Sequence, residues 1–253
     1  MPTASLLVVL AALVLVDGPP NRISSPLNDA QRRAEAQQHF SAGQDSMHAE
    51  AFERAVREFK AAIELDPQLV LAHYNLGQAH MALKQYPEAV QAYLGCRQAI
   101  EHLNSLQQGQ IVERDHEIDD QIHDLRDLIR RVRQERTADP GNKIMMIEER
   151  IRVLEGIRGK GNDRHARVPA ELYLALGSAY YRQGALADAE REYAEAIKSD
   201  AKLGPAHNNL AVIYMLSGRY KEARVALQKA EKSGFPVNPN LKRDLEAREA
   251  ASH

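Results

Sequence analysis

Two stretches of the sequence decide the fold: LGSAYYRQGALADAEREYAEAI at residues 176–197 and LAVIYMLSGRYKEARVALQKAE at residues 210–231. Gly184 of the first stretch recurs as Gly218 of the second, 34 positions later. Apolar residues follow helical spacing on both sides of these glycines, so each stretch predicts a helix, a turn and a second helix. A recurrence at a fixed period indicates copies of one structural unit.

An earlier part of the chain shows the same period, because Gly43 recurs as Gly77 and Phe59 recurs as Tyr93, again 34 positions later. We therefore expect four copies of one helix-turn-helix unit. The small residues among the recurring positions have a packing role, since larger side chains would push the paired helices apart. The copies are placed at residues 36–69, 70–103, 170–203 and 204–237.

The residues that recur in these copies resemble the tetratricopeptide repeat family. They are Leu76, Gly77, Ala89, Tyr93 and Cys96 in the second copy, and Leu176, Gly177, Tyr180, Ala189, Tyr193 and Ala196 in the third. The resemblance implies an all-α solenoid that binds other polypeptides. We expect two repeat pairs, at 28–103 and 170–237, and a polar C-terminal cap helix at 238–253. Asn238-Pro239 supplies an N-cap residue and a proline for its first helical position.

Residues 104–169 interrupt the array and lack the glycine and alanine pattern of the copies. Apolar residues at alternating steps of three and four predict a long helix over about 110–136 and a helix that returns along it. Asp139–Asn142 predicts the turn between them, and the polar link Gly159–Arg167 is expected to leave the two repeat pairs at a variable angle. The seam residues are Ile118, Ile122, Leu125, Ile129 and Val132, then Ile144, Ile147, Ile151 and Leu154.

Two roles are open for this inserted helical hairpin. In the first, its helices pair within the chain or dock on the repeats, since the seam spans few heptads. In the second, the arm formed by residues 110–158 drives self-association. The protein would then be a structural homo-oligomer in which the repeats only stack, rather than an adaptor.

The N-terminus carries an unbroken apolar run, Leu6–Val16, of the length of a signal-peptide core and shorter than a membrane span. We expect residues 1–20 to be a signal peptide or an N-terminal anchor, which makes the protein exported or membrane-anchored. The run lacks a preceding Lys or Arg and a small-x-small cleavage site. An uncleaved anchor and a wrongly assigned start therefore stay open, and the protein is cytoplasmic if the run is not a signal.

Charge and cysteine content exclude several classes of function. The formal net charge is -2, with acidic and basic residues evenly spread, so the chain lacks the basic face of proteins that bind DNA or RNA. We expect no nucleic acid partner. Cys96 is the only cysteine, which excludes an internal disulfide and a cysteine-rich metal site. It takes the small-residue position of a repeat helix, where burial makes a thiol inert.

One grouping could support metal chemistry, the stretch HEIDDQIH at residues 116–123. His116, Asp119, Asp120 and His123 can share one helix face and could hold a divalent ion. The stretch lacks the second histidine that a zinc protease helix requires, and a charged helix produces such groupings by chance. We therefore expect a solvated face, no metal, no cofactor and no enzymatic activity.

The family resemblance implies that partners bind to the inner wall of the superhelix, on the first helix of each copy. This wall is largely apolar, which suits an apolar helix or an extended peptide. Arg182 is its one basic residue, which disfavours a grip on a terminal carboxylate. The alternative is a wall covered by the protein's own hairpin, whose Met145 and Met146 fall outside the seam. The candidate partner-binding residues are Met47, Leu71, Tyr74, Gln78, Met81, Leu174, Tyr181, Arg182, Asn208, Val212 and Met215.

Overall fold

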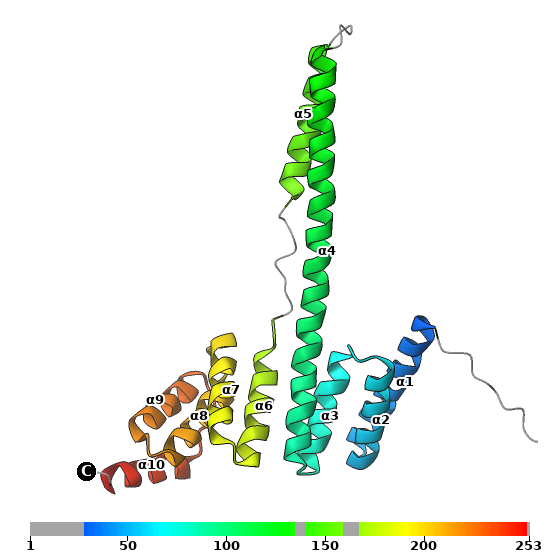
Figure 1. The fold of residues 1–253 in the computed structure, drawn as a ribbon. Coiled ribbons are helices and arrows are strands. Elements are labelled where there is room, and N and C mark those ends of the chain that lie inside the picture. The colour runs from blue at the N-terminus through cyan, green and yellow to red at the C-terminus, as the bar shows by residue number, and fades with distance from the viewer. Residues whose placement is uncertain (1–27, 135–139, 159–166, 252–253) are drawn as a thin grey trace, which may run out of the picture.

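The computed structural model describes residues 28–134, 140–158 and 167–251, and its regular elements in these ranges are all α-helices (Figure 1). The signal or anchor expected at 1–20 lies outside the described residues, as do Asp139 and nearly all of the link at 159–167. The helices are α1 (Asp29–His48), α2 (Phe52–Leu65), α3 (Val70–Ala82), α4 (Tyr86–Gln134), α5 (Pro140–Ile157), α6 (Ala170–Gln183), α7 (Leu186–Ser199), α8 (Gly204–Leu216), α9 (Tyr220–Lys232) and α10 (Pro239–Ala251).

Four helix pairs correspond to the four expected copies: α1 with α2, α3 with the first part of α4, α6 with α7, and α8 with α9. In the third and fourth pairs the turn contains a glycine with positive φ, 87° at Gly184 and 72° at Gly218. Residues that carry a side chain rarely adopt a backbone conformation with positive φ, which explains why glycine recurs at these two positions. The all-α solenoid predicted from the 34-residue period is therefore confirmed.

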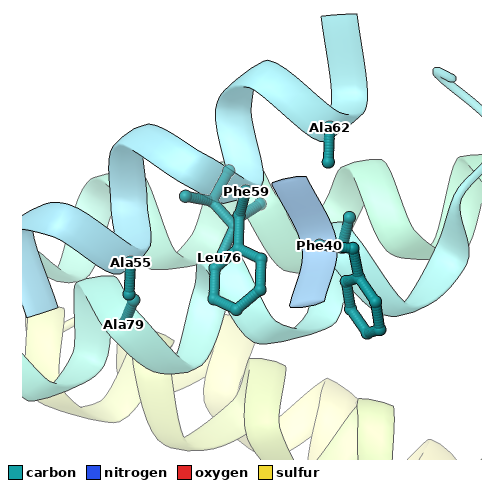
Figure 2. Packing of buried hydrophobic residues seen from close by; sticks show 8 residues of the cluster. Phe40, Ala55, Phe59, Ala62, Leu76 and Ala79 are labelled. Carbon is teal, nitrogen blue, oxygen red and sulfur yellow. The ribbon is translucent and has the colours of Figure 1, made fainter. Parts of the chain in front are cut away.

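The recurring small residues allow close contact between the two helices of a pair, as predicted. A Cβ on Gly77 would lie 2.4 Å from Cε1 of Tyr93, and a Cβ on Gly177 would lie 2.7 Å from the ring of Tyr193. The tight fit continues between copies. Phe59 of α2 packs with Leu76 of α3 in one buried cluster with several alanines (Figure 2).

Helix α4 crosses the boundary that the sequence placed at residue 103. A separate helix over about 110–136 was expected, but one helix of 49 residues runs from the second repeat into the inserted hairpin. The physical reason is local, because no proline or tight-turn sequence interrupts residues 100–134. Gly109 alone is tolerated inside a helix at a small cost. Pro140, Gly141 and Asn142, expected in a turn, form the start of α5, where a proline at the first position is well accommodated.

The two repeat pairs form one continuous array, which corrects the expectation of a variable angle between them. Tyr93, Cys96 and Ile100 of α4 share a buried cluster with Leu172 and Leu176 of α6. The apolar face of α4 would otherwise stay in water, so burial of this face favours a fixed contact across the insertion. The inserted residues leave the array as an arm that projects away from the repeats (Figure 1).

The arm is a hairpin of the distal part of α4 and the whole of α5. The predicted seam is confirmed, because Ile118, Ile122 and Ile129 of α4 pack with Ile151 and Leu154 of α5. At the other end of the array, α10 covers α9 through Leu245, which shares a buried cluster with Leu227. No helix among the described residues combines the length and the apolar character that crossing a membrane requires.

Candidate partner-binding surface

The predicted wall residues come from α1, α3, α6 and α8, the first helices of the four repeats, and they fall into three groups by exposure. The first group is freely accessible. Leu71 is 58% exposed, and Gln78 and Arg182 are also exposed. Leu216, a further wall position in α8, is 55% exposed. Leu71 on α3 and Leu216 on α8 give a partner two exposed apolar anchor points.

The second group is half-buried and has a structural role as well. The ring of Tyr74 lies 5.6 Å from that of Tyr93 at an interplanar angle of 53°, and Met81 packs on the same cluster. Burial raises the pKa of the Tyr74 phenol, while its hydrogen bond with Gln78 acts in the opposite direction. Tyr74 therefore stays a neutral hydrogen-bonding group at physiological pH and presents its remaining surface to a partner.

The same holds in the other repeats. Leu174 and Tyr181 pack partly on the cluster of Tyr193 and Leu210. Met47 packs on the cluster of the first repeat. Two half-buried residues complete the group: Asn208, which donates to Oδ1 of Asn209 at 3.3 Å, and Val212. The structure thus brings these positions into successive first helices, with part of each side chain accessible.

Met215 forms the third group and corrects the prediction. It is only 8% exposed and packs with Ala211, Leu227 and Leu245. The cap helix α10 brings Leu245 onto this end of the array, so Met215 is enclosed by the chain itself and offers little surface to a partner. Sequence periodicity placed Met215 on the wall but could not show what covers it.

The hairpin leaves the wall uncovered, contrary to the alternative in which its methionines fill the groove. Helix α5 packs along the distal part of α4, away from the repeats (Figure 1). Met145 and Met146 are 61% and 72% exposed on this arm.

Two grooves on the opposite, outer face were not predicted. The first, of about 780 Å³, lies over α3 between α2 and α4, with Ile63, Leu76 and Ala92 in its lining. The second, of about 590 Å³, lies over α8 between α7 and α9, with Ile197, Leu210 and Ala226 at the corresponding positions. Comparing the copies position by position would have paired these residues, because each pair is separated by the same 134 positions.

A salt bridge occupies the equivalent place at the middle junction. Arg97 stands where the other two junctions have Ile63 and Ile197, and Glu192 stands where they have Ala92 and Ala226. Nη1 of Arg97 lies 3.3 Å from both carboxylate oxygens of Glu192, whose side chain is 4% exposed. The junction that spans the insertion therefore differs in chemistry from the two that do not.

The residues considered for catalysis are placed as follows. His123 has a 75% exposed side chain and lies 4.0 Å from Asp127, and Asp119 pairs with Arg158 at 2.6 Å. Within the described ranges, no group of three or more His, Cys, Asp or Glu side chains is arranged to hold a metal ion. Cys96 is buried, and burial raises the pKa of its thiol to about 11, as expected for a packing residue.

Comparison with protein families gives two matches. A family model described as a TPR repeat matches residues 49–84, which contain α2 and α3. A tetratricopeptide repeat model matches residues 164–205 and 174–239, which contain α6 to α9. No protein of curated function matches this chain in sequence.

Several solved structures are similar to this chain at low identity. PilW, a widely conserved type IV pilus biogenesis factor, is 13% identical, with 85% of this chain and 86% of that chain covered and a TM-score of 0.41. A thermophilic TPR protein of Thermus thermophilus is 17% identical, with 85% and 99% covered and a TM-score of 0.33. YrrB, a TPR protein with an unusual peptide-binding site, is 16% identical, with 85% and 92% covered and a TM-score of 0.30. Scores of this size say nothing about shared partners.

Proposed function

This chain belongs to the tetratricopeptide repeat family, and from that premise we propose that it is a non-enzymatic scaffold whose inner wall binds a segment of another protein. The observation that carries the proposal is the row of accessible apolar side chains on successive first helices. It runs from Leu71 through Tyr74 and Tyr181 to Leu216. Large apolar side chains on a rigid scaffold are the usual anchors of a protein interface.

The chemistry of the wall favours an apolar helix or an extended peptide as the bound segment. Its half-buried tyrosines and Met81 are held by the repeat core, so little side-chain entropy is lost when a partner binds. Gln78, Asn208 and Arg182 supply polar contacts beside these apolar groups. Arg182 is the single basic group among the candidate residues, which supports recognition by shape and apolar contact more than by charge.

A place outside the cytoplasm is part of this proposal. The apolar run Leu6–Val16 supports export or membrane tethering of the scaffold. Fractionation of the native host tests it, with the protein expected in a membrane or exported fraction. Recovery of the soluble cytoplasmic protein with Met1 retained would contradict it.

The wall is tested by placing charges at its two most exposed apolar positions, Leu71→Glu together with Leu216→Glu. Both side chains are more than half exposed, so the double variant should keep its helicity. An unpaired carboxylate buried in an apolar contact costs several kcal/mol, so crosslinked partners recovered from the host should be lost at least about a hundredfold. Val112→Glu, at a 48% exposed valine on the arm, is the matched control and should keep every partner. Equal recovery with both variants would place binding elsewhere.

A further inference from the structure

The two sides of the arm differ in chemistry. On one side, ion pairs cross from α4 to α5: Arg126 pairs with Glu155 at 2.9 Å, and Arg133 pairs with Glu148 at 3.9 Å. These residues also line a shallow polar groove along the hairpin with Arg130. The charges on this side satisfy one another.

The opposite side carries exposed apolar side chains. Leu128 follows Arg126 by two residues, and Val153 precedes Glu155 by two. A step of two residues turns about 200° around a helix, so both side chains face away from the ion-paired side. Met146 precedes Glu148 by two residues and shares the face, as does Ile157, one turn beyond Val153. These side chains are exposed: Leu128 37%, Met146 72%, Val153 43% and Ile157 43%.

This apolar side is unusual for the molecule. Of the eleven large apolar side chains that stand exposed in the described ranges, four lie on this one side: Leu128 of α4 and Met146, Val153 and Ile157 of α5. The arm projects away from the array, so no repeat helix covers its exposed side chains (Figure 1). Exposed apolar surface gathered on one element marks an interaction site.

The charges on the same side are self-complementary. Asp124 precedes Arg126 by two residues and Arg131 precedes Arg133 by two, so both share the face of Leu128. Neither Asp124 nor Arg131 forms an ion pair within the described ranges. Along α4 the order is therefore acid, leucine, base. If the α4 helix of a second copy lies alongside in the opposite direction, Asp124 of each copy faces Arg131 of the other copy. Leu128 then faces Leu128 of the second copy.

Helix α5 has the same property. Met146 and Ile157 lie at the two ends of its exposed row, with Arg150 and Val153 between them, so reversing the helix sets Met146 against Ile157. The Arg126–Glu155 and Arg133–Glu148 pairs fix how α4 and α5 align along the arm. In this alignment, the midpoint between Asp124 and Arg131 on α4 lies nearly level with the midpoint between Met146 and Ile157 on α5. One two-fold axis can therefore relate both helices to a second copy, as an isologous interface requires.

From this pattern we propose that two copies of this chain dimerise through the Leu128, Met146, Val153 and Ile157 side of the arm, with the arms antiparallel. The four helices form a bundle in which α4 packs on α4 and α5 packs on α5. The two repeat arrays then lie at opposite ends of the bundle, and both inner walls stay free for partners.

The test uses the full chain and two independent variants. Leu128→Cys should form a disulfide-linked dimer under mild oxidation, because the two-fold axis brings this position close to its own copy. Val112→Cys is the matched control: Val112 is 48% exposed but lies fourteen residues before Arg126, close to four full turns, and so on the ion-paired side. Cys96 is buried and adds little background. Equal crosslinking of the two variants would overturn the proposal.

The antiparallel orientation is tested by charge reversal, with the dimer dissociation constant measured by sedimentation. Asp124→Arg alone places an arginine opposite Arg131 at both symmetry-related positions of the interface. This repulsion should raise the dimer dissociation constant at least about tenfold. Asp124→Arg combined with Arg131→Asp recreates both pairs and should restore dimerisation. Unchanged helicity confirms that the exposed substitutions leave the arm folded. A wild-type chain that stays monomeric at all concentrations, or a double variant as weak as the single one, would contradict the interface.

Discussion

Arg97 of α4 and Glu192 of α7 are separated by 95 residues in the sequence, yet the Nη1 atom of Arg97 lies 3.3 Å from both carboxylate oxygens of Glu192. Glu192 is almost fully buried, so it depends on this partner, with Arg191 more distant at 4.0 Å. The pair lies at the junction where α6 must find α4 across the inserted arm. A buried charge accepts only a matching partner, so the pair favours correct stacking over alternative registers of the repeats.

The first prediction concerns this pair. Arg97→Ile leaves Glu192 buried without its main partner and should lower the free energy of unfolding by about 2–4 kcal/mol. Arg97→Ile together with Glu192→Ala recreates the Ile63 and Ala92 chemistry of the neighbouring junction and should recover most of that loss. Urea unfolding of the wild type, both single variants and the double variant measures the coupling. A double variant no more stable than Arg97→Ile would show that the pair does not act as a unit.

The second prediction compares two helical glycines. Gly77→Ala places a methyl group 2.4 Å from Cε1 of Tyr93, so overpacking should destabilise the protein by about 1–3 kcal/mol. Gly109→Ala meets nothing within 4 Å in the middle of α4 and should stabilise it by about 0.5–1 kcal/mol through helix propensity. Thermal unfolding of both variants should therefore show shifts of opposite sign. A Gly77→Ala variant as stable as the wild type would mean that the Gly77 contact with Tyr93 is not tight, and a destabilised Gly109→Ala variant would contradict the open space around Gly109.

The third prediction concerns Cys96. Its pKa is raised to about 11 because burial penalises the thiolate, so the native thiol should react slowly with alkylating agents near pH 8. Denaturant should accelerate the reaction by orders of magnitude.

The raised pKa also has a consequence for stability. The folded chain holds the Cys96 proton more tightly than the unfolded chain does. The protonated thiol therefore makes its full contribution to the free energy of unfolding below pH 9, and this contribution is lost as the pH rises from 9 towards 11. The loss should disappear in Cys96→Ala, measured by urea unfolding at pH 8, 9 and 10. Rapid native alkylation near pH 8 would contradict burial of the thiol.

The fourth prediction separates the arm from the array. Replacing residues 108–160 by a short Gly/Ser linker removes the Ile118–Leu154 cluster but keeps the contact of Tyr93 and Cys96 with Leu172. The repeats should therefore stay helical and unfold in a single transition, as followed by circular dichroism in urea. The same chain should be monomeric in sedimentation and should keep the partners that bind the wall. Two separate unfolding transitions would show that the repeat pairs need the arm to stay together.

Local features of the sequence were enough to predict the repeat units and much of the candidate site. Gly77 and Tyr93 recur at fixed spacing because this helix pair needs a small residue opposite an aromatic ring, and the requirement repeats in the first three copies. The same register placed Leu71, Tyr74 and Tyr181 on the first helices, where the structure finds them with accessible surface. Helical periodicity also identified the arm seam of Ile118, Ile122 and Ile151.

The sequence by itself thus determined the kind of helix pair, its period and the apolar face of each helix, because these depend on residues three or four positions apart or on one repeat length. The tertiary structure alone decided what covers each face. It packs α4 on α6 across the insertion, encloses Met215 beneath Leu245 and joins Arg97 to Glu192. Periodicity shows that a helix face is apolar, but it does not show which element buries that face. The covering element is selected by contacts between residues far apart in the chain. The hydrophobic effect treats all apolar faces alike, so only charge and shape distinguish one covering helix from another.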